Sequence, residues 1–148
     1  MAFAHRATHL QADRAESGRK FPGVFSIMRT SSIIAIVDDD PGVRGSLDSL
    51  MRSAGITPRC FASAEELLGD PAAAGLCCIL ADIHMPGMTG LALQAELVRR
   101  GWPQPMILMT AHPTDAARQQ AMAGGAAAFL TKPIDPDALL EAIASAAM

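Results

Sequence analysis

The sequence predicts an α/β fold in which a doubly wound, five-stranded parallel sheet is flanked by five helices. Five short apolar runs follow residue 31, and turn-forming or polar residues bound each of them. Between the runs lie segments whose apolar residues have helical spacing. Strands that alternate with helices pair in parallel, because each helix supplies the crossover connection that parallel neighbours need.

The five apolar runs differ in how deeply they should be buried. Ile33–Val37 consists mostly of β-branched residues, which is typical of a strand buried on both faces. Thr57–Phe61 contains Pro58, which cannot donate a ladder hydrogen bond and therefore favours a position near the sheet edge. The other strands are expected over residues 76–81, 106–109 and 126–130.

Capping residues and apolar spacing mark the helices. An apolar stripe between residues 43 and 54 predicts the first helix, and Gly55 closes it. Ser63 and Glu66 have capping-box spacing and begin a short helix. Asp135, followed by a proline at the first helical position, begins the last. The predicted helices cover residues 43–54, 63–68, 91–98, 114–123 and 136–148.

The chain divides into an N-terminal extension and one domain. Its 148 residues are 50% hydrophobic and 18% charged, which suits a single packed domain and excludes wholesale disorder. Residues 1–30 have a net charge of +3, no sustained apolar period and no signal-sequence pattern. We expect them to form a flexible or partly ordered extension. Residues 31–148, which carry the remaining net charge of −6, form the predicted domain.

Net charge and cysteine content indicate the cellular location and the kinds of partner to expect. A net charge of −3 is a poor basis for non-specific nucleic-acid binding, and no apolar run approaches the roughly 20 residues that span a membrane. Cys60, Cys77 and Cys78 lack zinc-ligand spacing and are expected to be small buried hydrophobic residues in a reducing compartment. We therefore expect a soluble cytoplasmic protein with no direct nucleic-acid or membrane contact.

Polar residues follow four of the predicted strands at the point where each strand ends. In a doubly wound sheet, ligands bind beyond the carboxyl ends of the strands. This rule brings three carboxylates, one hydroxyl and one ammonium group to the same edge of the sheet, namely those of Asp38, Asp39, Asp82, Thr110 and Lys132.

The residue types at this edge indicate phosphoryl chemistry at a hard cation. Three clustered carboxylates repel one another unless a cation neutralises them, and an all-oxygen ligand set selects Mg²⁺. An ammonium group neutralises phosphate charge, and a hydroxyl donates to a phosphate oxygen. If a carboxylate is itself the nucleophile, the product is an acyl phosphate.

Four short motifs occur in order at these strand ends. They are Val37-Asp38-Asp39, the segment DIHMPGMTG that begins at Asp82, Thr110-Ala111 and Lys132-Pro133. In this combination, over residues 32–148, the chain resembles the receiver domain of two-component response regulators and is similar to the receivers of helix-turn-helix transcriptional regulators. The resemblance implies a flavodoxin-like receiver fold. It also implies a regulatory domain that catalyses only its own phosphorylation and dephosphorylation.

The resemblance assigns the phosphoacceptor and the metal ligands. Asp82 would accept a phosphoryl group from the phosphohistidine of a sensor histidine kinase or of a histidine phosphotransfer domain. Asp39, Asp82 and the backbone carbonyl of His84 would hold Mg²⁺, with Asp38 acting partly through water.

The resemblance also assigns the groups that bind the phosphoryl oxygens. Lys132 and Thr110 would contact them through their side chains, and the backbone amides of Ile83, His84 and Ala111 would assist. In this family the peptide bond between the lysine and the following proline is often cis.

A switch and its target surface follow from the same resemblance. Thr110 and Phe129 would form the switch pair, in which the hydroxyl moves toward phosphate and the ring turns inward. The face formed by residues 114–147 would then bind a downstream protein or a second copy of the chain. His84 and His112 flank the site, and they either tune the attack of water on the acyl phosphate or are ordinary exposed loop residues.

Several functions remain open from the sequence. The leading one is a phosphorylation-switched binding module, and a phosphate sink or a phosphorelay intermediate is a variant of it. An aspartate-nucleophile phosphatase of haloacid-dehalogenase type would use Asp38 as nucleophile and Asp40 as general acid, although Asp40 also suits a helix cap. A pseudo-receiver with a vestigial pocket is the third. No basic recognition helix follows the predicted domain, so we expect no DNA-binding output domain.

Overall fold

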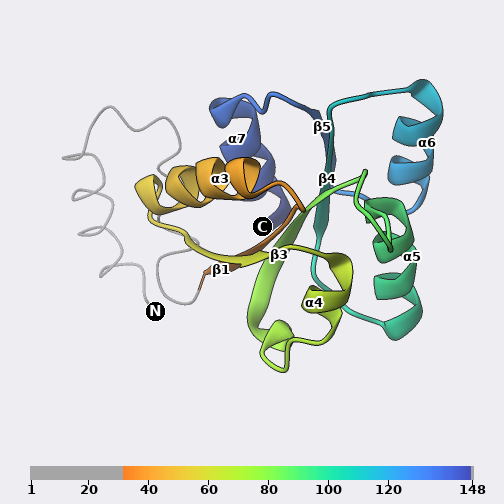
Figure 1. The fold of residues 1–148 in the computed structure, drawn as a ribbon, viewed down its shortest axis with the longest axis horizontal. Helices are drawn as coiled ribbons and strands as arrows, with labels where there is room; N and C mark the ends of the chain where they lie inside the picture. The colour runs from red at the N-terminus through yellow and green to blue at the C-terminus, as the bar shows by residue number, and fades with distance from the viewer. Residues whose placement is uncertain (1–31, 148) are drawn as a thin grey trace, which may run out of the picture.

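A computed structural model describes residues 32–147, and the predicted N-terminal extension over residues 1–30 lies outside them. Five parallel strands form one sheet in the order β2-β1-β3-β4-β5 (Figure 1), which confirms the predicted architecture. The strands are β1 Ile33–Val37, β2 Thr57–Phe61, β3 Leu76–Asp82, β4 Met106–Thr110 and β5 Ala128–Thr131. The helices are α3 Pro41–Ser53, α4 Ala64–Leu68, α5 Gly90–Arg100, α6 Asp115–Ala123 and α7 Pro136–Ala147, with a short 3₁₀ helix η1 at Ala73–Gly75.

The helices cover both faces of the sheet, as Figure 1 shows. On one face, α3 and α7 pack their apolar stripes against alternate residues of the central strands. On the other face, α4, α5 and α6 do the same. Ile34 and Ile36 of β1 face the first of these layers and Ala35 and Val37 the second, and all four are fully buried. This arrangement explains why β1 has no polar alternation.

Three strands have boundaries that differ from the predicted ones, and β5 ends at Thr131, one residue later than predicted. β3 and β4 each extend one residue further, so Asp82 and Thr110 are the last residues of their strands. β5 begins at residue 128, whereas the sequence predicts 126. The Ala126 N–H donates to the Ala121 carbonyl at the end of α6, and strand pairing begins only when Ala128 lies opposite Ile107.

Side-chain caps begin α4 and α7 at the predicted residues. α3 and α5 begin earlier than the predicted residues 43 and 91, because Asp40 and Thr89 cap them. The Asp135 carboxylate accepts a hydrogen bond from the Ala138 N–H at the start of α7. The Ser63 hydroxyl accepts from the Glu66 N–H, but the Glu66 carboxylate bonds to the Ala62 N–H and not to the Ser63 N–H that a capping box uses. Among residues 32–147, no helix combines the length and the apolar character needed to cross a bilayer.

The predicted burial of the cysteines is confirmed only in part. Cys78 is buried and Cys77 is half-buried, but Cys60 is exposed because it lies on β2 at the edge of the sheet.

Candidate functional site

The sheet topology brings the predicted site residues together at one edge. Asp38 directly follows β1, Asp82 ends the neighbouring β3, Thr110 ends β4 and Lys132 directly follows β5. Backbone hydrogen bonds hold the strand ends together at this edge. One of them runs from the Lys132 N–H to the Thr110 carbonyl over 2.8 Å. Because parallel strands end together, residues far apart in sequence become neighbours here.

The Lys132 ammonium group lies between two carboxylates. Its Nζ is 2.7 Å from Asp38 Oδ2 and 3.3 Å from Asp82 Oδ2. Asp38 is fully buried, Asp82 is 5% exposed and the lysine side chain is 15% exposed, so these charges are shielded from solvent. The peptide bond between Lys132 and Pro133 is cis, as the family resemblance implies.

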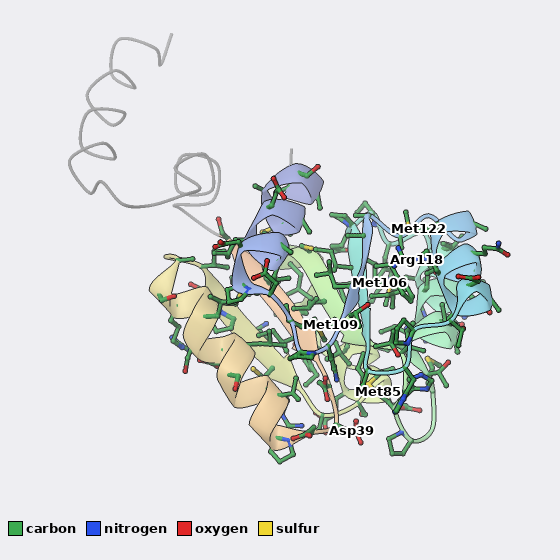
Figure 2. The ribbon with its side chains drawn as sticks, turned by 90° about the horizontal axis from the view of Figure 1, so that it is seen from above. Asp39, Met85, Met106, Met109, Arg118 and Met122 are labelled. Atoms are coloured by element: carbon green, nitrogen blue, oxygen red, sulfur yellow. The ribbon has the colours of Figure 1, made fainter. Side chains whose placement is uncertain are left out.

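The carboxylates form one cluster that is partly open to solvent. One oxygen from each of Asp38, Asp39 and Asp82 lies within 4.8 Å of the other two. Asp39 is exposed, and in Figure 2 it lies where β1 leads into α3. Buried oxygen donors beside an exposed one suit Mg²⁺, which prefers oxygen ligands and retains several waters. The donor set therefore fits the predicted metal.

Two residues fix the backbone around Asp38. Asp38 Oδ1 accepts a hydrogen bond from the Asp40 N–H over 2.9 Å. The Arg44 guanidinium donates to the Asp38 carbonyl over 2.6 Å. Asp40 itself accepts from the Gly42 and Val43 N–H groups, so it caps α3.

Burial and neighbouring charge shift the pKa values of the two central groups. Burial, and then the charge of Asp38, raise the pKa of Asp82, and these effects outweigh the opposing influence of Lys132. Burial lowers the pKa of Lys132, but its hydrogen bond and charge interaction with Asp38, followed by those with Asp82, reverse the effect and raise it. The lysine therefore stays charged at neutral pH, while the ionised form of Asp82 is disfavoured.

The raised pKa predicts that Asp82→Asn stabilises the metal-free protein. Above the ordinary carboxyl pKa of 3.8, the folded state binds more protons than the unfolded chain, so stability falls as pH rises through the raised pKa. Without Mg²⁺ at neutral pH, the variant should therefore have a Tm several degrees higher than the unmodified protein. The difference should shrink as the pH falls below 3.8, because the carboxyl then becomes protonated in the unfolded chain as well. Thermal unfolding at both pH values tests this.

The control for that measurement is Asp115→Asn. Asp115 is exposed in the first turn of α6, where a negative charge is favourable. Its removal should leave the Tm unchanged or slightly lower. If Asp82→Asn had a lower Tm than the unmodified protein at neutral pH, this would contradict the conclusion that burial raises the pKa of Asp82.

Thr110 and the residues after it line the same edge. Thr110 is fully buried, and its hydroxyl oxygen accepts a hydrogen bond from the His112 N–H over 2.9 Å. That bond leaves the hydroxyl proton available to another acceptor. Ala111 between them is exposed.

The loop after β3 places backbone groups beside Asp82. The His84 N–H donates to Asp82 Oδ1 over 3.3 Å. The Ile83 N–H already donates to the Met109 carbonyl over 2.8 Å, so a phosphate contact by that amide would cost this hydrogen bond. The exposed rings of His84 and His112 meet edge to face, with their centroids 5.8 Å apart.

Phe129 lies further from the carboxylates, on β5. It is 7% exposed, belongs to the core on the side of α4, α5 and α6, and lies opposite Leu108, two positions before the level of Thr110. The guanidinium of Arg118, labelled on α6 in Figure 2, covers the ring at 4.7 Å from its centroid. Arg118 was not predictable from the sequence, because an exposed arginine on an amphipathic helix has no distinctive pattern.

The sequence matches a known domain family and resembles two response regulators. Residues 34–144 match the family model of the response regulator receiver domain. The chain is 37% identical over 131 residues to response regulator protein TmoT of Ectopseudomonas mendocina, a match that covers 86% of this chain and 60% of TmoT. It is 40% identical over 118 residues to transcriptional regulatory protein FixJ of Azorhizobium caulinodans, covering 78% of this chain and 55% of FixJ.

A solved structure shares the fold. The crystal structure of FixJ-N matches with a TM-score of 0.72 and 31% sequence identity, covering 78% of this chain and 93% of that one. The chain thus spans 55 to 60% of the length of the two relatives named above, and it matches nearly all of the FixJ-N structure.

Proposed function

Because this chain belongs to the response regulator receiver domain family, we propose that it is a regulatory domain that accepts a phosphoryl group on Asp82. The observation that supports this most strongly is the position of the Lys132 ammonium group, 2.7 Å from Asp38 and 3.3 Å from Asp82. It places a fixed positive charge beside a carboxylate that can act as a nucleophile.

Mg²⁺ would be held by Asp39, Asp82 and the backbone carbonyl of His84. Asp38 would act on it partly through water, because both of its oxygens already have partners in Lys132 and the Asp40 N–H. When bound, the ion neutralises negative charge on the carboxylates and on the incoming phosphoryl group.

In the transfer step, a carboxylate oxygen of Asp82 attacks the phosphorus of a phosphohistidine. A new O–P bond forms as the P–N bond breaks, and its electron pair stays on the imidazole nitrogen of the donor. The product on Asp82 is an acyl phosphate. The Lys132 ammonium group and the Thr110 hydroxyl stabilise the charge on the phosphoryl oxygens, helped by the amides of His84 and Ala111. Attack of water on phosphorus later restores the carboxylate.

The signal passes from Thr110 to the surface through Phe129. Thr110 is fully buried on β4, and Phe129 lies on the adjacent β5 beneath Arg118 of α6. A movement of the hydroxyl toward phosphate therefore changes the packing under α6. The face formed by residues 114–147 is the proposed contact for a downstream protein or a second copy of the chain. The phosphoryl donor is a histidine kinase or a histidine phosphotransfer domain.

The haloacid-dehalogenase-type alternative has less support. Its nucleophile would be Asp38, which is fully buried and bonded to Lys132, and its general acid would be Asp40, which caps α3. Use as a phosphate sink or relay intermediate remains a variant of the proposed function. The absence of direct nucleic-acid contact remains a prediction for these residues.

The experiment that tests the proposal locates the phosphoryl group. The protein is incubated with Mg²⁺ and a small-molecule phosphoryl donor, and the acyl phosphate is reduced with borohydride before mass spectrometry. We expect one modification per chain, at Asp82, and none in Asp82→Asn or after chelation of the metal. Modification at another residue would contradict the proposal. Repeated turnover that is lost in Asp38→Asn would favour the phosphatase instead.

A further inference from the structure

The loop over residues 83–89, between β3 and α5, carries the backbone groups that the proposed site uses. Its ends are fixed to the fold. The Gly90 N–H donates to the Ile83 carbonyl over 2.9 Å, and the buried Met85 side chain anchors the loop in the core. The outer part of the loop, around Gly87 and Met88, is held differently.

Glu65 of α4 holds this outer part. Its Oε2 accepts a hydrogen bond from the Met88 N–H over 3.1 Å, across 23 positions of sequence. The same oxygen lies 3.0 Å from the place where a Cβ on Gly87 would be, and Gly87 has a φ of +74°, which favours glycine. The carboxylate therefore fits closely against a turn that has no side chain in its way.

The contact is not needed by the helix that carries Glu65. The Ser63 hydroxyl caps the start of α4. The Glu66 carboxylate bonds to the Ala62 N–H, which also lies at the N-terminal end of this helix. Glu65 and Glu66 both lie in the first turn, so the helix dipole favours both charges alike. They differ in what they contact, because Glu65 bonds to the loop whereas Glu66 bonds to the Ala62 N–H.

We propose that Glu65 is a positioning residue that holds the 83–89 loop in the conformation that sets the His84 backbone beside Asp82. The 3.3 Å contact between the His84 N–H and Asp82 Oδ1 is the feature that this conformation maintains. The inference rests on the proposed function, since the position of the loop affects activity only if the His84 backbone helps to bind Mg²⁺ and the phosphoryl group. Residues behind the direct ligands commonly orient those ligands and tune metal affinity.

The test follows Mg²⁺ binding directly, without a phosphoryl donor, by NMR titration of the backbone amides of the full chain. Glu65→Ala is expected to weaken Mg²⁺ binding roughly tenfold, at the low end for such residues because the contact is solvent-exposed. Hydrogen exchange of the Met88 amide should also become faster. Glu65→Gln should keep the slow exchange and most of the Mg²⁺ affinity, because its amide oxygen can still accept the Met88 hydrogen bond.

Glu66→Ala is the matched control. It removes the same charge from the same helical turn, so it accounts for electrostatic effects and for loss of α4 stability. It is expected to leave both the Mg²⁺ affinity and the Met88 exchange rate nearly unchanged. If the unmodified protein binds Mg²⁺ and is phosphorylated on Asp82 while Glu65→Ala behaves like Glu66→Ala, the positioning role is wrong and the proposed function stands. If the unmodified protein does neither, the proposed function fails and the role of Glu65 fails with it.

Discussion

Lys132→Met is expected to lower the initial rate of Asp82 phosphorylation by about a hundredfold or more, the usual effect of removing one charge-stabilising donor from a transition state. Lys132 Nζ is within 3.3 Å of both buried carboxylates, so its loss removes the cation that offsets their repulsion. The pKa of Asp82, already raised by burial and by Asp38, should rise further and reduce the share of ionised nucleophile. Methionine keeps the length and apolar stem of lysine, so packing changes little. The measurement is the initial labelling rate with a small-molecule donor and saturating Mg²⁺.

Arg52→Met provides the matched loss of a cation. Arg52 pairs with Asp48 at 2.7 Å on α3, and its side chain is 63% exposed. Exposed pairs of this kind contribute little to stability. This pair also has no contact with the candidate site. The labelling rate of this variant should equal that of the unmodified protein. A rate for Lys132→Met within a few fold of the unmodified protein would show that the ammonium group does not stabilise the transferred phosphoryl group.

The edge of the sheet that carries the site was predictable because it follows from local patterns. Each strand is a short apolar run, and a polar residue at its end is visible in the sequence. The parallel topology then brings Asp38, Asp82 and Lys132 together without any further information. The start of β5 was less predictable, since Ala126 suits a strand by composition but is used to close α6.

Contacts made by exposed side chains across the fold were not predictable. The Glu65 carboxylate reaches the Met88 N–H over 23 positions, and the Arg118 guanidinium covers Phe129 from another element. Neither residue has a distinctive spacing, because its partner is set by how helices and loops pack and not by periodicity. The capping box shows the same effect on a smaller scale, since the Glu66 carboxylate selects the Ala62 N–H in place of the adjacent one.

Gly90→Ala is expected to destabilise the protein by about 3 kcal/mol, the range of severe steric substitutions, and to lower its Tm by roughly 10 °C. Gly90 begins α5 at its closest approach to the end of β3. A Cβ there would lie 2.4 Å from the Asp82 carbonyl oxygen and 2.9 Å from the Ile83 Cα. These neighbours are backbone atoms, so α5 and the end of β3 must separate. Because Asp82 moves with that strand end, labelling should also slow at temperatures where the variant is still folded.

Gly45→Ala makes the same chemical change where there is room for it. Gly45 lies within α3, is exposed, and a Cβ there meets no atom within 4 Å. Alanine is the better helix former by about 1 kcal/mol, so this variant should be more stable than the unmodified protein and be phosphorylated at the same rate. Chemical denaturation of both variants gives the two free energies of unfolding. Opposite signs are expected, because a backbone clash dominates at Gly90 and helix propensity dominates at Gly45. Equal stabilities would mean that the contact between α5 and the end of β3 is looser than the structure has it.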